Sequence, residues 1–134
     1  MADLQPFNAI LNAHQSKQRL GGGDDTRIVM TNHDLRDLDM RGVDFRNADL
    51  RESNLSGANL GGADMRGANL AAAVLLNVDF TNALLCYADF SEADLRGSDL
   101  SGADLTGAEM WRCNLKGCRV SPEALHEMLS CRKP

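Results

Sequence analysis

The side chains best suited to catalysis or metal binding are 3 histidines and 4 cysteines. His14 and His126 lie toward the two ends of the chain, and no serine, cysteine or carboxylate stands with them in the pattern of a catalytic dyad or triad. Cys113 and Cys118 are five residues apart, unlike the paired C-x-x-C spacing of zinc sites. We therefore predict no catalysis, no cofactor and no metal site. An enzyme is a remote alternative that would need a cleft beside His33.

Aspartates offer a second kind of chemistry, because many of them are separated by multiples of twenty residues. Evenly spaced carboxylates along a rod could imitate the phosphates of DNA, whose charges also repeat regularly. Arginines two residues after several aspartates dilute such a field, among them Arg41, Arg46 and Arg66. The two candidate rows are Asp39, Asp79 and Asp99, with Asn59 between them, and Asp44, Asp64 and Asp104.

The element that would position these residues is defined by a five-residue rhythm. From Met30 to Val120 every fifth residue is apolar, and the residue two positions before it is usually small. Neither a helix, with about 3.6 residues per turn, nor a strand, with a period of about two, keeps such positions on one face. A short extended segment followed by a sharp corner keeps these positions on one face. Glycines stand two residues after many of the apolar positions, and glycine adopts the backbone conformations that sharp corners require. Four corners close a square, so we predict four to five stacked coils.

The repeats NADL at 47–50, SGANL at 56–60, RGANL at 66–70 and SGADL at 101–105 resemble the A(D/N)LxG motif of pentapeptide repeat proteins. The resemblance covers roughly residues 28–120 and implies an all-β, right-handed quadrilateral parallel β-helix. It implies no particular activity, because this family is defined by its scaffold. Some members bind DNA gyrase by imitating DNA. A type II topoisomerase that binds the aspartate rows is therefore the alternative function.

The flanks of the repeats are expected to cover the open ends of the solenoid. Residues 6–19 carry an apolar face and precede three glycines, which predicts an N-terminal capping helix. Ser121 and Pro122 indicate a helix start, because serine caps helices and proline suits their first turn. The predicted domains are a capping helix and Gly-rich connection at 1–27, the β-helix at 28–120, and a short C-terminal capping helix and tail at 121–134.

The charge and hydropathy of the chain restrict its partners. The net charge is -5, and residues 28–120 contain fourteen acidic and nine basic side chains. An acidic surface disfavours direct binding to nucleic acid or to membranes. No apolar run reaches membrane length, and no signal-peptide core follows Met1. We expect a cytoplasmic protein that is a monomer, or a dimer through an end cap or an apolar patch.

Residues 71–90 break the repeat pattern on the outside of the solenoid. Val74 and Leu84 stand where Asp or Asn usually precedes the apolar position, and Tyr87 occupies a corner where small residues are common. Exposed apolar side chains of this kind can mark a partner surface. The main hypothesis is a rigid, non-enzymatic scaffold that binds an unidentified protein partner. Its expected contacts are Val74, Leu76, Leu84, Tyr87 and Trp111.

Overall fold

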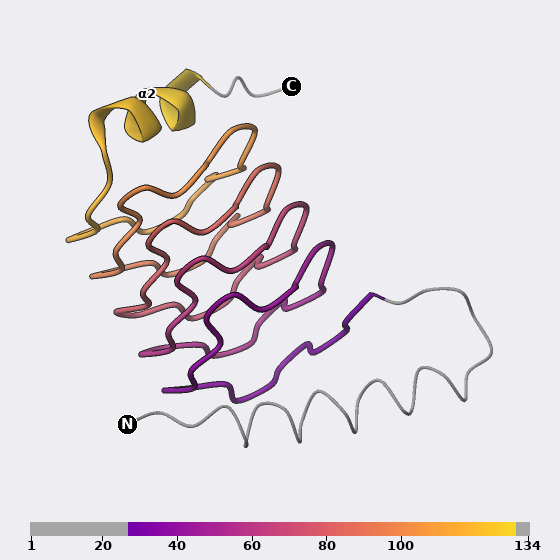
Figure 1. Ribbon diagram of the computed structural model, residues 1–134. Coiled ribbons are helices and arrows are strands. Elements are labelled where there is room, and N and C mark those ends of the chain that lie inside the picture. The colour runs from indigo at the N-terminus through magenta and orange to yellow at the C-terminus, as the bar shows by residue number, and fades with distance from the viewer. Residues whose placement is uncertain (1–26, 131–134) are drawn as a thin grey trace.

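The computed structural model describes residues 27–130 of the 134-residue chain, with side chains as far as residue 126. The predicted capping helix at 6–19 therefore lies outside the described residues, as do the glycines that follow it. Residues 27–120 wind into a stack of similar coils, and the helix α2, Pro122–Ser130, lies over the last coil (Figure 1).

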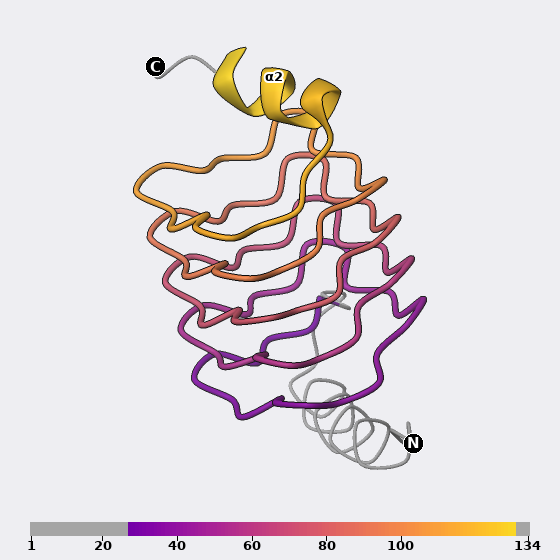
Figure 2. The same cartoon turned by 90° about the vertical axis from the view of Figure 1, so that its left-hand side faces the viewer.

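Each pentapeptide contributes one parallel β-bridge to the next coil rather than a long strand. Bridges join residues twenty apart, as in Asn59↔Asp79 and Asp79↔Asp99. The amide of Leu60 donates to the carbonyl of Asp79 at 2.8 Å, and the amide of Gly62 donates to Thr81 at 2.9 Å. These bonds pair the backbone of each coil with its neighbours, so the stack behaves as one continuous β-helix (Figure 2).

The corners are type II turns. Every residue two positions after an apolar central residue has a positive φ, from Asn32 through Gly117, with values between 56° and 75°. In most corners the carbonyl of the central residue accepts a bond from the amide three positions later, which completes the type II turn, as from Ala63 to Leu60 at 3.0 Å. Eight of the eighteen positive-φ positions are glycines, which adopt this conformation without steric penalty.

Three corners of the described coils lack this backbone bond, those that begin at Met30, Leu35 and Leu75, and in the first and third a serine hydroxyl from the next coil enters the turn. The Ser98 hydroxyl accepts from the amide of Val78 at 3.0 Å and donates to the carbonyl of Leu75 at 2.6 Å. Ser53 makes the same two bonds, to the His33 amide and the Met30 carbonyl. Both serines are fully buried, so each hydroxyl bridges a turn that would otherwise leave polar backbone groups without a partner.

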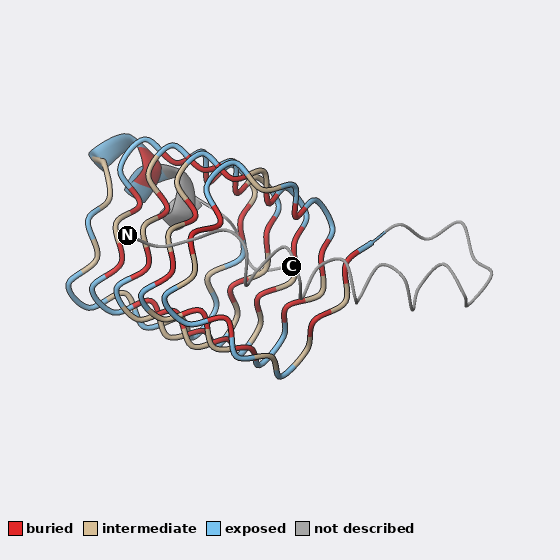
Figure 3. Cartoon of the chain, turned by 60° about the horizontal axis from the view of Figure 1, so that its bottom comes forward, coloured by how far each residue is buried: buried red, intermediate tan, exposed pale blue. Residues whose placement is uncertain are grey.

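The central residues fill the interior of the solenoid (Figure 3). From Met30 to Leu100 all of them have zero exposure, which confirms that these central residues line the interior. Phe80 and Phe90 meet edge to face inside the tube, with ring centroids 6.0 Å apart. The four sides are named here by their central residues: side A has Met30, Leu50, Leu70, Phe90 and Met110; side B has Leu35, Leu55, Leu75, Leu95 and Leu115; side C has Met40, Leu60, Phe80, Leu100 and Val120; side D has Phe45, Met65, Leu85 and Leu105.

The helix α2 begins as its sequence predicts. The Ser121 hydroxyl accepts from the amide of Ala124 at 3.1 Å, and the Ser121 carbonyl accepts from the amide of Leu125 at 2.9 Å. Ala124 is 8% exposed and belongs to the core cluster of the solenoid. Within residues 27–130 no helix has the length and apolarity that crossing a membrane requires.

Candidate interaction surface

The outer face of the N-terminal coils is covered by Asp-x-Arg ion pairs. Arg66 donates through Nε and Nη2 to the two carboxylate oxygens of Asp64, at 2.9 and 2.7 Å. The Arg66 amide also donates to Asp64, so each unit closes a small ring on the surface. The six pairs are Asp34–Arg36, Asp39–Arg41, Asp44–Arg46, Asp49–Arg51, Asp64–Arg66 and Asp94–Arg96.

These bidentate bonds stabilise the ionised carboxylates. The Arg36 guanidinium lowers the pKa of Asp34 to about 2, and Arg41 lowers the pKa of Asp39 in the same way. The side chain of Asp39 is only 7% exposed, although the sequence predicted an outward position for it. The contact with Arg41 does not by itself account for this burial, because Asp34 and Asp44 make the same contact with their arginines and remain 62% and 60% exposed.

Two aspartates of the later coils, Asp79 and Asp104, are held by hydroxyl groups instead. The Thr106 hydroxyl donates to Asp104 at 2.7 Å, and the Thr81 hydroxyl donates to Asp79 at the same distance. The hydrogen bonds of Thr106, from its side chain and its amide, lower the pKa of Asp104. A hydroxyl stabilises the charge of a carboxylate without neutralising it, so these aspartates keep their negative charge at the surface.

The two predicted aspartate rows have the expected register and an uneven charge. Bridges connect Asp39, Asn59, Asp79 and Asp99 in order, and a second series connects Asp44, Asp64, Leu84 and Asp104. Three of the six aspartates, Asp39, Asp44 and Asp64, are paired with arginine. Leu84 interrupts the second row.

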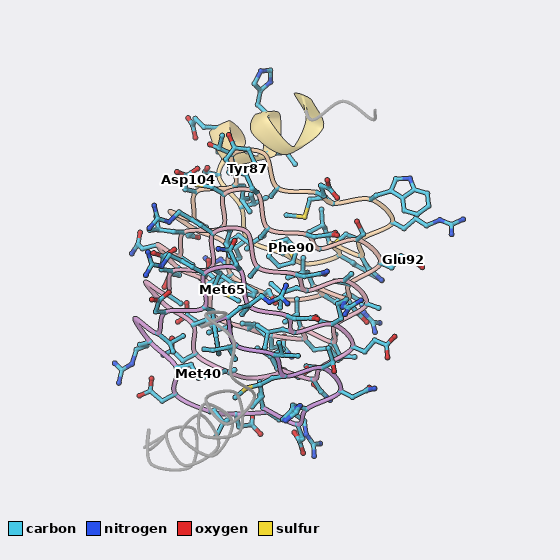
Figure 4. All side chains as sticks on the ribbon, turned by 90° about the vertical axis from the view of Figure 1, so that its right-hand side faces the viewer. Met40, Met65, Tyr87, Phe90, Glu92 and Asp104 are labelled. Carbon is cyan, nitrogen blue, oxygen red and sulfur yellow. The ribbon has the colours of Figure 1, made fainter. Side chains whose placement is uncertain are left out.

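Leu84 and Tyr87 form an apolar patch on side D and at its corner. Leu84 is 37% exposed and Tyr87 is 70% exposed. The Tyr87 ring lies directly against Gly107 of the next coil, where an added Cβ would be 2.4 Å from the ring atom Cδ1. Tyr87 has a φ of 61°, a strained conformation for a bulky residue. Figure 4 labels Tyr87 and Asp104 toward the end of the stack that carries α2.

The remaining residues of the predicted contact set lie elsewhere. Val74 and Leu76 are half-buried on side B, and the Leu76 amide donates to the Ser56 hydroxyl at 3.2 Å. Trp111 is 50% exposed at the corner after side A, with the Arg112 guanidinium 4.8 Å from its ring centroid. The five residues therefore form three separate groups, and the sequence had indicated that Leu76 would be more exposed than it is.

Cys86 and His33 have hydrogen-bond partners, and Cys113 is half-buried. Burial raises the pKa of Cys113 to about 12, and burial is also the main cause of the raised pKa of Cys86. The Cys86 thiol donates a hydrogen bond to Asp104, and this bond adds to the rise in the pKa of Cys86. His33 Nδ1 is 2.9 Å from the carbonyl oxygen of Thr31. Across residues 27–130 no three His, Cys, Asp or Glu side chains gather as metal ligands would.

This regular, filled solenoid with an exposed patterned surface defines a repeat scaffold protein. Comparison with protein families gives the same class: the family described as "Pentapeptide repeats" matches residues 30–67, 63–102 and 87–121, in 8 copies. The chain belongs to the pentapeptide repeat family. Proteins of this family form right-handed β-helices, which confirms the predicted fold at that level. No curated protein sequence matches the chain significantly.

Solved structures support the same fold. HetL, a pentapeptide repeat protein involved in heterocyst differentiation regulation in the cyanobacterium Nostoc, is 30% identical with a TM-score of 0.67; the match covers 69% of this chain and 45% of HetL. QnrB1, a plasmid-mediated fluoroquinolone resistance protein, is 14% identical with a TM-score of 0.56, and the match covers 69% of this chain and 57% of QnrB1. This chain thus spans about half the length of these neighbours.

Proposed function

We propose that this protein is a non-enzymatic scaffold that binds a protein partner through the patch formed by Leu84 and Tyr87. The observation that carries the proposal is the exposure of both side chains on a backbone that the β-helix holds rigid. A preorganised surface loses little conformational entropy on binding, so a small patch can contribute useful affinity. A larger partner would also contact other sides of the solenoid, where it would reach Val74, Leu76 and Trp111.

The proposal includes the finer features of the predicted architecture. The solenoid has four to five coils, and α2 caps its last coil. Ala124 supports this cap, because it is buried against the core. The protein acts in the cytoplasm, as a monomer or as a dimer through an end cap or the patch.

The alternative function is imitation of DNA toward a type II topoisomerase. Asp79 and Asp104 favour it, because threonine hydroxyls and not arginines hold their carboxylates. Asp99 is held by Ser101 but is also bridged to Arg119 of the last coil. The arginine pairs of the other three row aspartates weaken it, since a paired row presents little net charge. A gyrase supercoiling assay that shows neither inhibition nor protection from a quinolone would remove this alternative.

The proposed patch is tested by capture of partners on the immobilised protein, quantified by mass spectrometry. Leu84→Asp should remove the specific partner, because it replaces the apolar contact with a charge. Asn54→Asp is the matched control: it adds the same charge on side B, where its carboxylate can still accept the bond from the Ser56 amide. Both variants should keep the unfolding midpoint of the wild type. Equal recovery of the partner with Leu84→Asp and wild type would contradict the proposal.

A further inference from the structure

Acidic charge is segregated along the solenoid. Residues 27–70 contain seven acidic and six basic side chains, and five of those bases form bidentate pairs with aspartate. Residues 71–109 contain seven acidic side chains and one base, Arg96. Arg96 lies on side B and is already bound to Asp94. Sides A, C and D of residues 71–109 therefore carry carboxylates with no arginine or lysine of that segment beside them.

The apolar patch lies inside this acidic region. Leu84 is bridged to Asp104 on the following coil, and Asp104 is exposed. Tyr87 turns the corner from side D to side A, where Glu109 is also exposed. On the preceding coil Leu84 is bridged to Asp64, which Arg66 already neutralises. The free negative charge next to the patch thus comes from the coil after it, and Asp104 is its nearest member.

We infer that the Leu84–Tyr87 patch takes a basic segment of a partner protein, in which an apolar side chain is flanked by lysine or arginine. This inference rests on the proposed function and adds the chemistry of the partner. The apolar side chain packs against Leu84 and the Tyr87 ring, and the flanking base reaches Asp104. Charge complementarity of this kind selects partners and speeds their association.

The chain itself supplies the change that tests the role of charge. Arg46 and Arg66 occupy, on side D, the position that Thr106 occupies in a later coil, and each binds its aspartate with both nitrogens. Thr106→Arg should therefore neutralise Asp104 by a contact that the fold already uses twice on this side. The patch itself stays unchanged, so a loss of binding would report charge rather than shape.

The experiment selects binders for the full chain from a phage-displayed library of random dodecapeptides. We expect enriched peptides with a bulky apolar residue next to lysine or arginine. Synthetic peptides of the enriched sequence should bind Thr106→Arg at least tenfold more weakly than wild type, and binding should weaken as NaCl is raised. Ser56→Arg adds the same charge on side B and should change the affinity less than twofold. Circular dichroism and the unfolding midpoint establish that both variants are folded.

The outcomes separate this inference from the proposed function. The inference is overturned if the enriched peptides lack basic residues, or if they bind Thr106→Arg as tightly as wild type. In either case the proposed patch stands if Leu84→Asp abolishes the binding of these peptides. Equal weakening by Thr106→Arg and Ser56→Arg also overturns the inference, because only the net charge would then matter. The inference and the proposed function are both contradicted if the peptides bind Leu84→Asp as tightly as wild type, or if the selection enriches no peptide.

Discussion

At the residue scale, the corners hold side chains in a backbone conformation that most residues avoid. Five corner positions with positive φ are neither Gly, Asn nor Asp: Glu52, Ala72, Tyr87, Glu92 and Arg112. Four of them lie on the corner that follows side A. The left-handed conformation brings Cβ close to the following carbonyl oxygen, so each of these residues destabilises the coil locally. The surrounding hydrogen bonds and the packed core compensate for this strain.

Ala72 provides a clean test of that strain, because its φ is 59° and its side chain is a methyl group. Ala72→Gly should raise the free energy of unfolding by about 1 kcal/mol, as the clash is removed. Ala71→Gly, one residue earlier in the same turn, should instead lower it by roughly 0.5–1 kcal/mol through added backbone entropy. Urea unfolding followed by circular dichroism measures both. Changes of the same sign would show that φ does not decide the effect.

The ion pairs make a prediction about acid. Arg36 lowers the pKa of Asp34 from 3.8 to about 2, and the pKa values of Asp39, Asp44 and Asp64 are lowered by their arginines. A carboxylate with a lowered folded-state pKa stabilises the fold above its unfolded pKa and stops doing so as the pH falls through its folded pKa.

The urea midpoint should therefore be flat above about pH 5 and fall as the pH decreases from about 4 toward 2. Replacing Arg41 with glutamine should make that fall shallower, because Asp39 would then titrate nearer its ordinary pKa. A midpoint that rises on acidification would contradict the assignment of these pairs.

At the element scale, the unit of structure is the turn together with the coil beside it. Most turns close through their own backbone, as Ala73 does to Leu70 at 3.0 Å. The turn from Leu75 to Val78 closes instead through the Ser98 hydroxyl, twenty residues further along. In this turn the larger Val78 side chain occupies the inward position where alanine is common. The turn with the larger side chain is the one that the Ser98 hydroxyl bridges. This device links two coils through side-chain chemistry as well as through the ladder.

Ser98→Ala should lower the free energy of unfolding by about 1–3 kcal/mol, because the Val78 amide and the Leu75 carbonyl lose a buried partner. The double variant Val78→Ala/Ser98→Ala restores the common repeat and should close its turn like that of Ala73. Its loss of stability should be smaller than the sum of the two single losses. A double-mutant cycle from urea unfolding measures the difference, and strict additivity would contradict the bridged turn.

The sequence predicts the elements well because the repeat is redundant. Each central residue from Met30 to Val120 indicates the same register, so a single unusual residue does not change the prediction. Serine and alanine both count as small inward residues, however, and nothing in the spacing showed that Ser98 would bridge a turn. The contact of Tyr87 with Gly107 could have been found from their separation of twenty. The half-burial of Leu76 could not, because it depends on how its neighbours on side B pack.

At the scale of the whole molecule, the solenoid is a rod whose N-terminal and later coils differ in charge. The N-terminal coils present closed ion pairs, and the later coils present free carboxylates around an apolar patch. The sequence showed both sets of residues. It also indicated which row aspartates are neutralised, because an arginine stands two positions after Asp39, Asp44 and Asp64. The bidentate geometry of these pairs became visible only in the structure. The proposed partner surface follows from this difference between the two halves.

The central claim is that residues twenty apart lie on top of one another inside the tube, and nuclear Overhauser contacts test it most directly. In a sample with labelled leucine methyls and phenylalanine rings, the Phe80 ring should contact the methyls of both Leu60 and Leu100. The ring should also contact Phe90, whose centroid lies 6.0 Å away across the interior. Absence of the contacts to Leu60 and Leu100, with Phe80 seen only beside its neighbours in sequence, would contradict the coil register and with it the surface assigned to Leu84 and Tyr87.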